Sequence, residues 1–185
     1  MSHRHLRAIA IGLALVVAPM GAVGAWAAQA TLSCAPGGPS AASLQPRISA
    51  AARQAAATAG FAALTPAAKL KAVQDAVAAE LALSGACPEV IQAALIQAVG
   101  SGTISAGVAI NIAAGISPEM AQAVATNPIV LAQLRQTGQS ATITASTEGG
   151  VPVNVLVTLQ GAGGNGGNPA PYDPCEGVVA AYCGG

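Results

Sequence analysis

Four prolines, each placed where a helix can begin, divide the middle of this chain into short segments. A short polar side chain caps the first turn of a helix, and proline suits the first helical position because an N–H group there would have no partner. Glycines close most of the segments in between. The four pairs are Thr65-Pro66, Cys87-Pro88, Ser117-Pro118 and Asn127-Pro128. This punctuation predicts a bundle of short helices.

Residues 44–138 are expected to form this helical domain, with about five to six helices. Apolar side chains at helical spacing form a stripe on one of them: Leu70, Val73, Val77 and Leu81. The chain is 53% hydrophobic but only 2% aromatic and 8% charged. Its apolar content is therefore mostly alanine, which favours helices but buries little area per residue. We predict a mainly α, alanine-rich fold with closely packed helices.

Two stretches of the helical domain match each other 30 residues apart. Gly85–Ala93 and Gly115–Ala123 share the pattern G-x-[CS]-P-E-h-x-Q-A, in which h is apolar. A step of this length suits a repeat of helix pairs. Two well-formed helix starts would produce the same match, and this is the simpler explanation.

The pattern changes from helical to alternating after Gly138. Residues 139–160 hold two alternating stretches on either side of Glu148-Gly149-Gly150, which predicts a β-hairpin. Because an isolated hairpin is only marginally stable in water, we expect it to dock on the helices or to pair with another chain. Residues 161–185 are expected to form a Gly/Asn-rich linker and a cysteine-containing tail.

Residues 1–27 have the three parts of a secretory signal peptide. Arg4 and Arg7 precede the uncharged apolar run 8–23, and Ala25-Trp26-Ala27 is a small-x-small cleavage site. Glycines and a proline in the apolar run argue against a retained membrane anchor. A lipoprotein signal at Cys34 fits poorly because this cysteine lies too far downstream. We expect a secreted or periplasmic bacterial protein of 158 residues that begins with an irregular arm, 28–43.

All four cysteines follow the predicted cleavage site. An even number of cysteines in an oxidising compartment predicts two disulfide bonds. Three pairings are open, and we favour Cys34–Cys87 together with Cys175–Cys183. A redox or metal role is not expected, because the mature chain has neither a CxxC motif nor a histidine.

Catalysis is not expected of the mature chain. Both histidines, His3 and His5, belong to the signal peptide. Lys69 and Lys71 occupy the polar side of a helix, and the carboxylates are scattered, so no catalytic, cofactor-binding or metal-binding residues are predicted. The mature chain keeps five Lys and Arg against seven Asp and Glu, a net charge of −2. This balance disfavours binding to nucleic acid.

So low a charge on an exported protein indicates a neutral polar surface or a surface covered by a partner. We expect a non-catalytic structural or interaction protein of the bacterial periplasm, cell surface or extracellular matrix. It would form a homo-oligomer or dock to a cell-envelope protein. The alternative is a membrane-active toxin or pore former that inserts the uncharged segment 90–118. Membrane association is not favoured, because Gly100-Ser101-Gly102 interrupts this segment and two short core helices fit it better.

Overall fold

The computed structural model describes residues 37–148, 151–162, 170–176 and 182–183. The chain separates into two units, Met1–Thr31 and Leu32–Gly185, and all described residues belong to the second. The predicted signal peptide and Cys34 lie outside the described residues. So do the centre of the predicted hairpin turn and most of the predicted linker.

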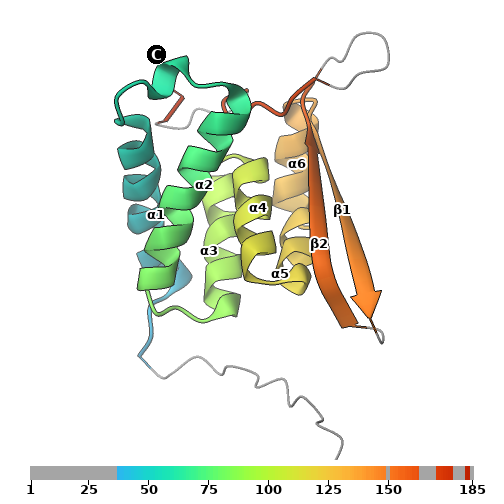
Figure 1. The fold of residues 1–185 in the computed structure, drawn as a ribbon. Coiled ribbons are helices and arrows are strands. Elements are labelled where there is room, and N and C mark those ends of the chain that lie inside the picture. Colours follow the sequence, from blue (N-terminus) through green and yellow to red (C-terminus); the bar gives the residue numbers. More distant parts are fainter. Residues whose placement is uncertain (1–36, 149–150, 163–169, 177–181, 184–185) are drawn as a thin grey trace, which may run out of the picture. The chain divides into compact units, whose positions relative to one another are not determined.

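The described part of the chain holds six α-helices followed by a two-stranded antiparallel hairpin, as predicted (Figure 1). A short 3-10 helix, η1 (Phe61–Ala63), follows the first α-helix. The strands are β1 (Ser140–Glu148) and β2 (Val151–Gln160). The α-helices are α1 (Ala41–Ala56), α2 (Pro66–Leu83), α3 (Pro88–Gly100), α4 (Ala106–Ile116), α5 (Pro118–Ala125) and α6 (Pro128–Gln136).

All four predicted proline starts are confirmed, as the first residues of α2, α3, α5 and α6. Side chains of three preceding residues accept hydrogen bonds from the first turn: Thr65, Ser117 and Asn127. The two stretches that match each other are the starts of α3 and α5. α1 begins at Ala41, three residues before the predicted boundary at Leu44. The reason is a capping box in which Ser40 and Ser43 bond each other's backbone.

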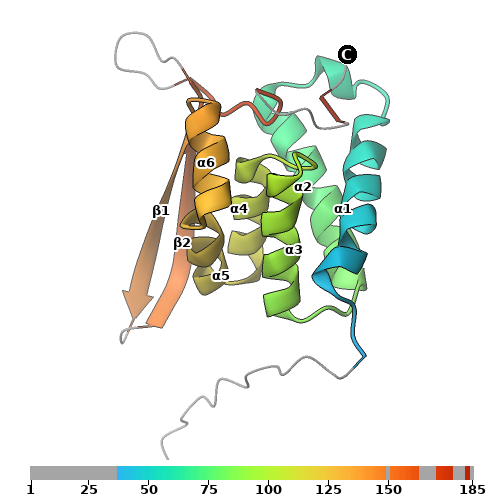
Figure 2. The same ribbon diagram turned by 180° about the vertical axis from the view of Figure 1, so that it is seen from behind.

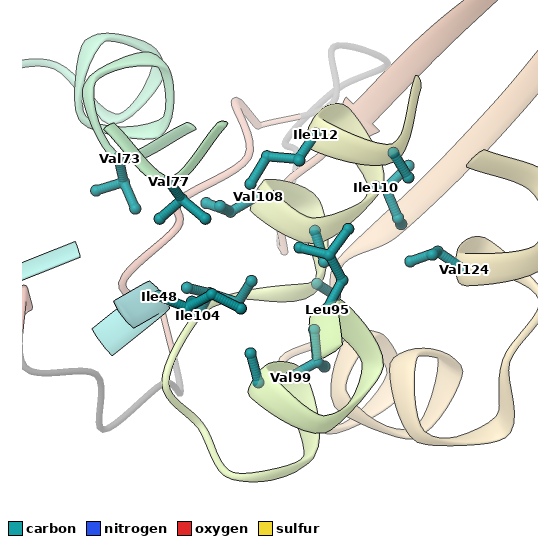
Figure 3. Close-up of a cluster of buried hydrophobic side chains, with 14 of the residues drawn as sticks. Ile48, Val73, Val77, Leu95, Val99, Ile104, Val108, Ile110, Ile112 and Val124 are labelled. Carbon is teal, nitrogen blue, oxygen red and sulfur yellow. The ribbon is translucent and has the colours of Figure 1, made fainter. Parts of the chain in front are cut away.

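α4 is the central element of the bundle. It contacts α2, α3, α5, α6 and β2 (Figures 1 and 2). In Figure 3, Val108 of α4 lies beside Val77 of α2, and Ile110 lies toward Val124 of α5. The uncharged segment 90–118 thus supplies two core helices, α3 and α4, as expected. The buried residues of α4 are Ala106, Gly107, Val108, Ala109, Ile110, Ile112 and Ala113.

No helix in the described ranges combines the length and the apolar character needed to cross a membrane.

The hairpin docks on the helices by one face, as expected. β2 contacts α4 and α5, and β1 contacts α5 and α6. Ile143 pairs with Val157 across the ladder, and both side chains are half-buried against the core. The opposite face of the hairpin is exposed and carries Thr142, Thr144, Leu156 and Thr158. One side of each strand is therefore anchored, and the other side faces solvent.

Gly107 of α4 provides a test of how tightly the C-terminal tail packs. A Cβ atom there would lie 2.5 Å from Tyr172 Cζ and 2.9 Å from Leu159 Cδ1. We expect Gly107→Ala to lower the free energy of unfolding by about 1–3 kcal/mol. The control is Gly115→Ala in the same helix, where the Cβ meets nothing within 4 Å. It should stabilise by up to about 1 kcal/mol, and urea unfolding that shows equal effects would contradict this packing.

Candidate interaction surfaces

The C-terminal tail is fixed to the start of α4 by Tyr172 and Tyr182, the only two tyrosines in the sequence. The Tyr182 hydroxyl accepts a hydrogen bond from the Ser105 N–H, at 2.8 Å. The Tyr172 hydroxyl accepts one from the Gly107 N–H, also at 2.8 Å. The first N–H groups of a helix have no acceptor within the helix. Two N–H groups at the start of α4, one from its N-cap residue and one from its first turn, thus find acceptors in the tail.

A third acceptor for the start of α4 comes from α6. Gln133 Oε1 accepts the N–H of Ala106, and Gln133 Nε2 donates to the carbonyl of Val99 at 3.3 Å. The Ser105 hydroxyl is fully buried beside the two tyrosines and makes no well-aligned hydrogen bond with any described residue. The polar contacts at this point therefore join α3, α4, α6 and the tail.

The predicted disulfide bond between Cys175 and Cys183 is confirmed, with 5.2 Å between the two Cα atoms. It closes a short loop of the tail that includes Tyr182 but not Tyr172. Cys87 is also disulfide-bonded. Its predicted partner, Cys34, lies outside the described residues, so the bond between them stays a prediction.

The ionisable side chains of the described residues do not gather into a reactive site. No group of three or more His, Cys, Asp or Glu among them could hold a metal ion. Lys71 is exposed and pairs with Asp75 on the same helix, at 2.8 Å. Arg47 of α1 pairs with Glu80 of α2. Lys69 and Lys71 both lie on α2, and Lys71 occupies the solvent-facing position that the sequence predicts.

A groove of about 840 Å³ lies between α1, η1 and α2. Alanine is the most frequent residue in its lining, which also includes Phe61, Leu64 and Leu83. The charged residues that line it, Arg47 and Glu80, bind each other. The groove therefore offers apolar surface but little that would orient a ligand.

The hydrogen-bond pattern of the hairpin shows which backbone groups of β2 face away from β1. The Gly161 N–H donates to the Ala170 carbonyl of the tail at 2.7 Å, and Gln160 forms an antiparallel bridge with Pro171. Successive residues of a strand point their backbone groups to opposite sides. The backbone of Gly161 points to the tail, so the backbone of Gln160 points to β1.

The register of the two strands shows which backbone groups of β1 point away from β2. Gln160 pairs with Ser140, Thr158 with Thr142, and Leu156 with Thr144. These are the hydrogen-bonded pairs, so the N–H and C=O groups of the residues between them point outward from the free edge of β1. The outward-pointing residues are Ala141, Ile143 and Ala145. Their backbone groups have no hydrogen-bond partner among the described residues.

A pocket of about 280 Å³ lies against the same three residues of β1. Its other wall comes from α5, with a contribution from Leu131 of α6. None of the lining side chains is charged: Pro118, Gln122, Ala125, Thr126, Leu131, Ala141, Ile143 and Ala145. Small-molecule sites usually begin at about 300 Å³, so this pocket suits individual side chains better than a whole ligand. We call the free edge and this pocket together the β1 edge site.

Comparisons with known proteins find no relative of this chain. No family model, no curated protein and no solved structure matches it.

The sequence predicted a hairpin in need of a partner, but not the β1 edge site or the role of the tyrosines. The edge site depends on register and on helix placement, which local patterns do not contain. The tyrosines carry a weak signal. They are rare aromatic residues, and each lies close in sequence to a tail cysteine.

The buried tyrosines predict a loss of stability at alkaline pH. Burial raises the pKa of Tyr182 to about 12 and also raises the pKa of Tyr172, whereas nearby Ser105 opposes both shifts. An unfolded tyrosine ionises near pH 10. The unfolded state therefore loses its protons first, so stability should be complete below about pH 10 and should fall as the pH rises to about 12. Phenolate absorbance and circular dichroism should change together.

Tyr182→Phe is the matching variant, since it keeps the ring and removes the acceptor of the Ser105 N–H. It should lower the free energy of unfolding by about 1–3 kcal/mol and weaken the dependence on alkaline pH. A folded protein whose tyrosines both ionise near pH 10 would contradict the arrangement.

Proposed function

We propose that this chain is an exported, non-catalytic interaction protein that docks to a partner or self-associates through its hairpin. The observation that carries the proposal is the free edge of β1, where three residues direct backbone groups outward beside an uncharged pocket, with no bonding partner among the described residues. Natural proteins usually protect such edges with charges, prolines or bulges. In this hairpin Glu148, Pro152 and the register shift after Ser146 all lie near the tip. Residues 140–146 of β1 carry no charge, no proline and no register shift.

Export to the bacterial periplasm, cell surface or extracellular matrix is supported by the leader-like residues 1–27 and by the cysteines. The Cys175–Cys183 bond is compatible with an oxidising compartment. A disulfide-closed tail also suits a small domain whose alanine-rich core buries little area.

The non-catalytic part of the proposal rests on the chemistry open to the mature chain. Removal of residues 1–27 removes both histidines, His3 and His5. Among the described residues, Lys71 and Glu80 are engaged in ion pairs near the surface. The described tyrosine hydroxyls are used as acceptors for α4. These groups support a structural use of polar side chains.

Cross-linking in the native host tests the proposed role. A photo-reactive amino acid at Thr142, on the exposed face of β1, should give a cross-linked product of higher mass after irradiation. The same amino acid at Lys71, on the exposed side of α2, serves as control and should give none. An absence of product from both positions would contradict the proposal, and so would equal yields from both.

Intact-mass analysis tests the proposed export. Protein recovered outside the cytosol should begin at Ala28, and all four cysteines should be unreactive toward a thiol reagent until they are reduced. Exported protein that retains Met1, or that reacts as four free thiols, would contradict this prediction.

A further inference from the structure

We infer that the β1 edge site binds an extended, uncharged peptide segment of a partner protein as a third strand of the sheet. This inference rests on the proposed function and names the chemistry of the partner. The outward N–H and C=O groups of Ala141, Ile143 and Ala145 would supply main-chain hydrogen bonds, and the pocket would accept side chains.

The geometry of an antiparallel ladder decides which side chains of the peptide enter the pocket. Residues directly opposite each other in a sheet place their side chains on the same face. Ile143 faces the helices, so the peptide residue opposite Ile143 also faces them, as do the residues two positions before and after it. Every second peptide side chain therefore points toward α5 and α6.

The lining of the pocket decides the character of these side chains. Leu131, Ala125 and Ile143 give it an apolar surface, and no charged residue lines it. Its volume of about 280 Å³ is shared among the inward positions of the peptide. Small or branched apolar residues such as valine fit these conditions. A charged residue at an inward position would lose its hydration without gaining a partner.

The β1 edge is favoured over the edge of β2 for two reasons. The tail already bridges the end of β2 through Gln160 and Pro171, and Gly161 bonds Ala170 there. The pocket lies against β1. A separate peptide is also favoured over a second copy of the chain. Two copies paired antiparallel through β1 would bring two sets of α5 and α6 to the same face of the sheet, where the pocket wall already stands.

The probe for this inference is a fluorescently labelled octapeptide of alternating threonine and valine. The matched peptide has glutamate in place of each valine. Fluorescence anisotropy with the full mature protein should show binding of the valine peptide. The affinity for the glutamate peptide should be lower by a factor of about ten or more. Failure of the valine peptide to bind would overturn the inference. A cross-link from Thr142 would then still support the proposed function.

Two protein variants locate the binding. Ala145→Pro removes an outward N–H that the hairpin does not use, and Gln122→Trp fills the pocket from α5. Each should weaken binding of the valine peptide by about tenfold. The matched controls are Val155→Pro, opposite Ala145 on β2, and Ala132→Trp on the exposed side of α6. Both controls should bind as the unmodified protein does.

The inference fails if the controls lose as much affinity as the two test variants. It also fails if light scattering shows a dimer that Ala145→Pro dissociates, because a second copy then occupies the edge. The two test variants act on different elements, so one that does not fold leaves the other to decide. Circular dichroism identifies such a variant.

Discussion

A helix surrounded by other elements can be stable only if its first N–H groups find acceptors away from water, and the fold depends on how α4 meets this requirement. The acceptors are the hydroxyls of Tyr182 and Tyr172 in the tail and the amide oxygen of Gln133 in α6. The hairpin lies between α6 and the tail in sequence. Both ends of the hairpin are therefore tied to the same helix terminus, and this fixes its position on the bundle.

An alanine-rich core makes such polar ties more important than in an ordinary bundle. Each buried alanine removes little apolar area from water, so packing stabilises each helix only modestly. The ion pair between Arg47 and Glu80 adds little, because both side chains are about one-third exposed. Hydrogen bonds between distant segments fill this role, such as those that join Ser105 to Tyr182 and Gly107 to Tyr172. The bond between Cys175 and Cys183 adds a local constraint by closing a short loop in the tail. Alanine is also the most frequent residue in the lining of the groove between α1 and α2.

Features of this fold that are encoded locally could be predicted from the sequence, and features that depend on distant segments could not. A proline at the first helical position marks a helix start locally, so the starts of α2, α3, α5 and α6 were predicted correctly, three of them with a capping side chain as well. The start of α1 was missed because Ser40 and Ser43 cap it without a proline. The contact between Tyr182 and Ser105 spans 77 residues. No pattern within a helix or strand specifies such a partner, and the same holds for the pocket between β1 and α5.

Attachment of the hairpin by one face determines what its edges can do. Ile143 and Val157 hold the inner face on the helices, so the sheet cannot turn its edges into the core. The tail covers the end of the β2 edge through Pro171, whereas in the described part of the chain no second strand lies along the outer edge of β1, the edge opposite β2. A fixed edge with an adjoining pocket needs little reordering when a strand is added. The same contacts that stabilise an isolated hairpin on an alanine-rich bundle therefore leave β1 preorganised for a partner.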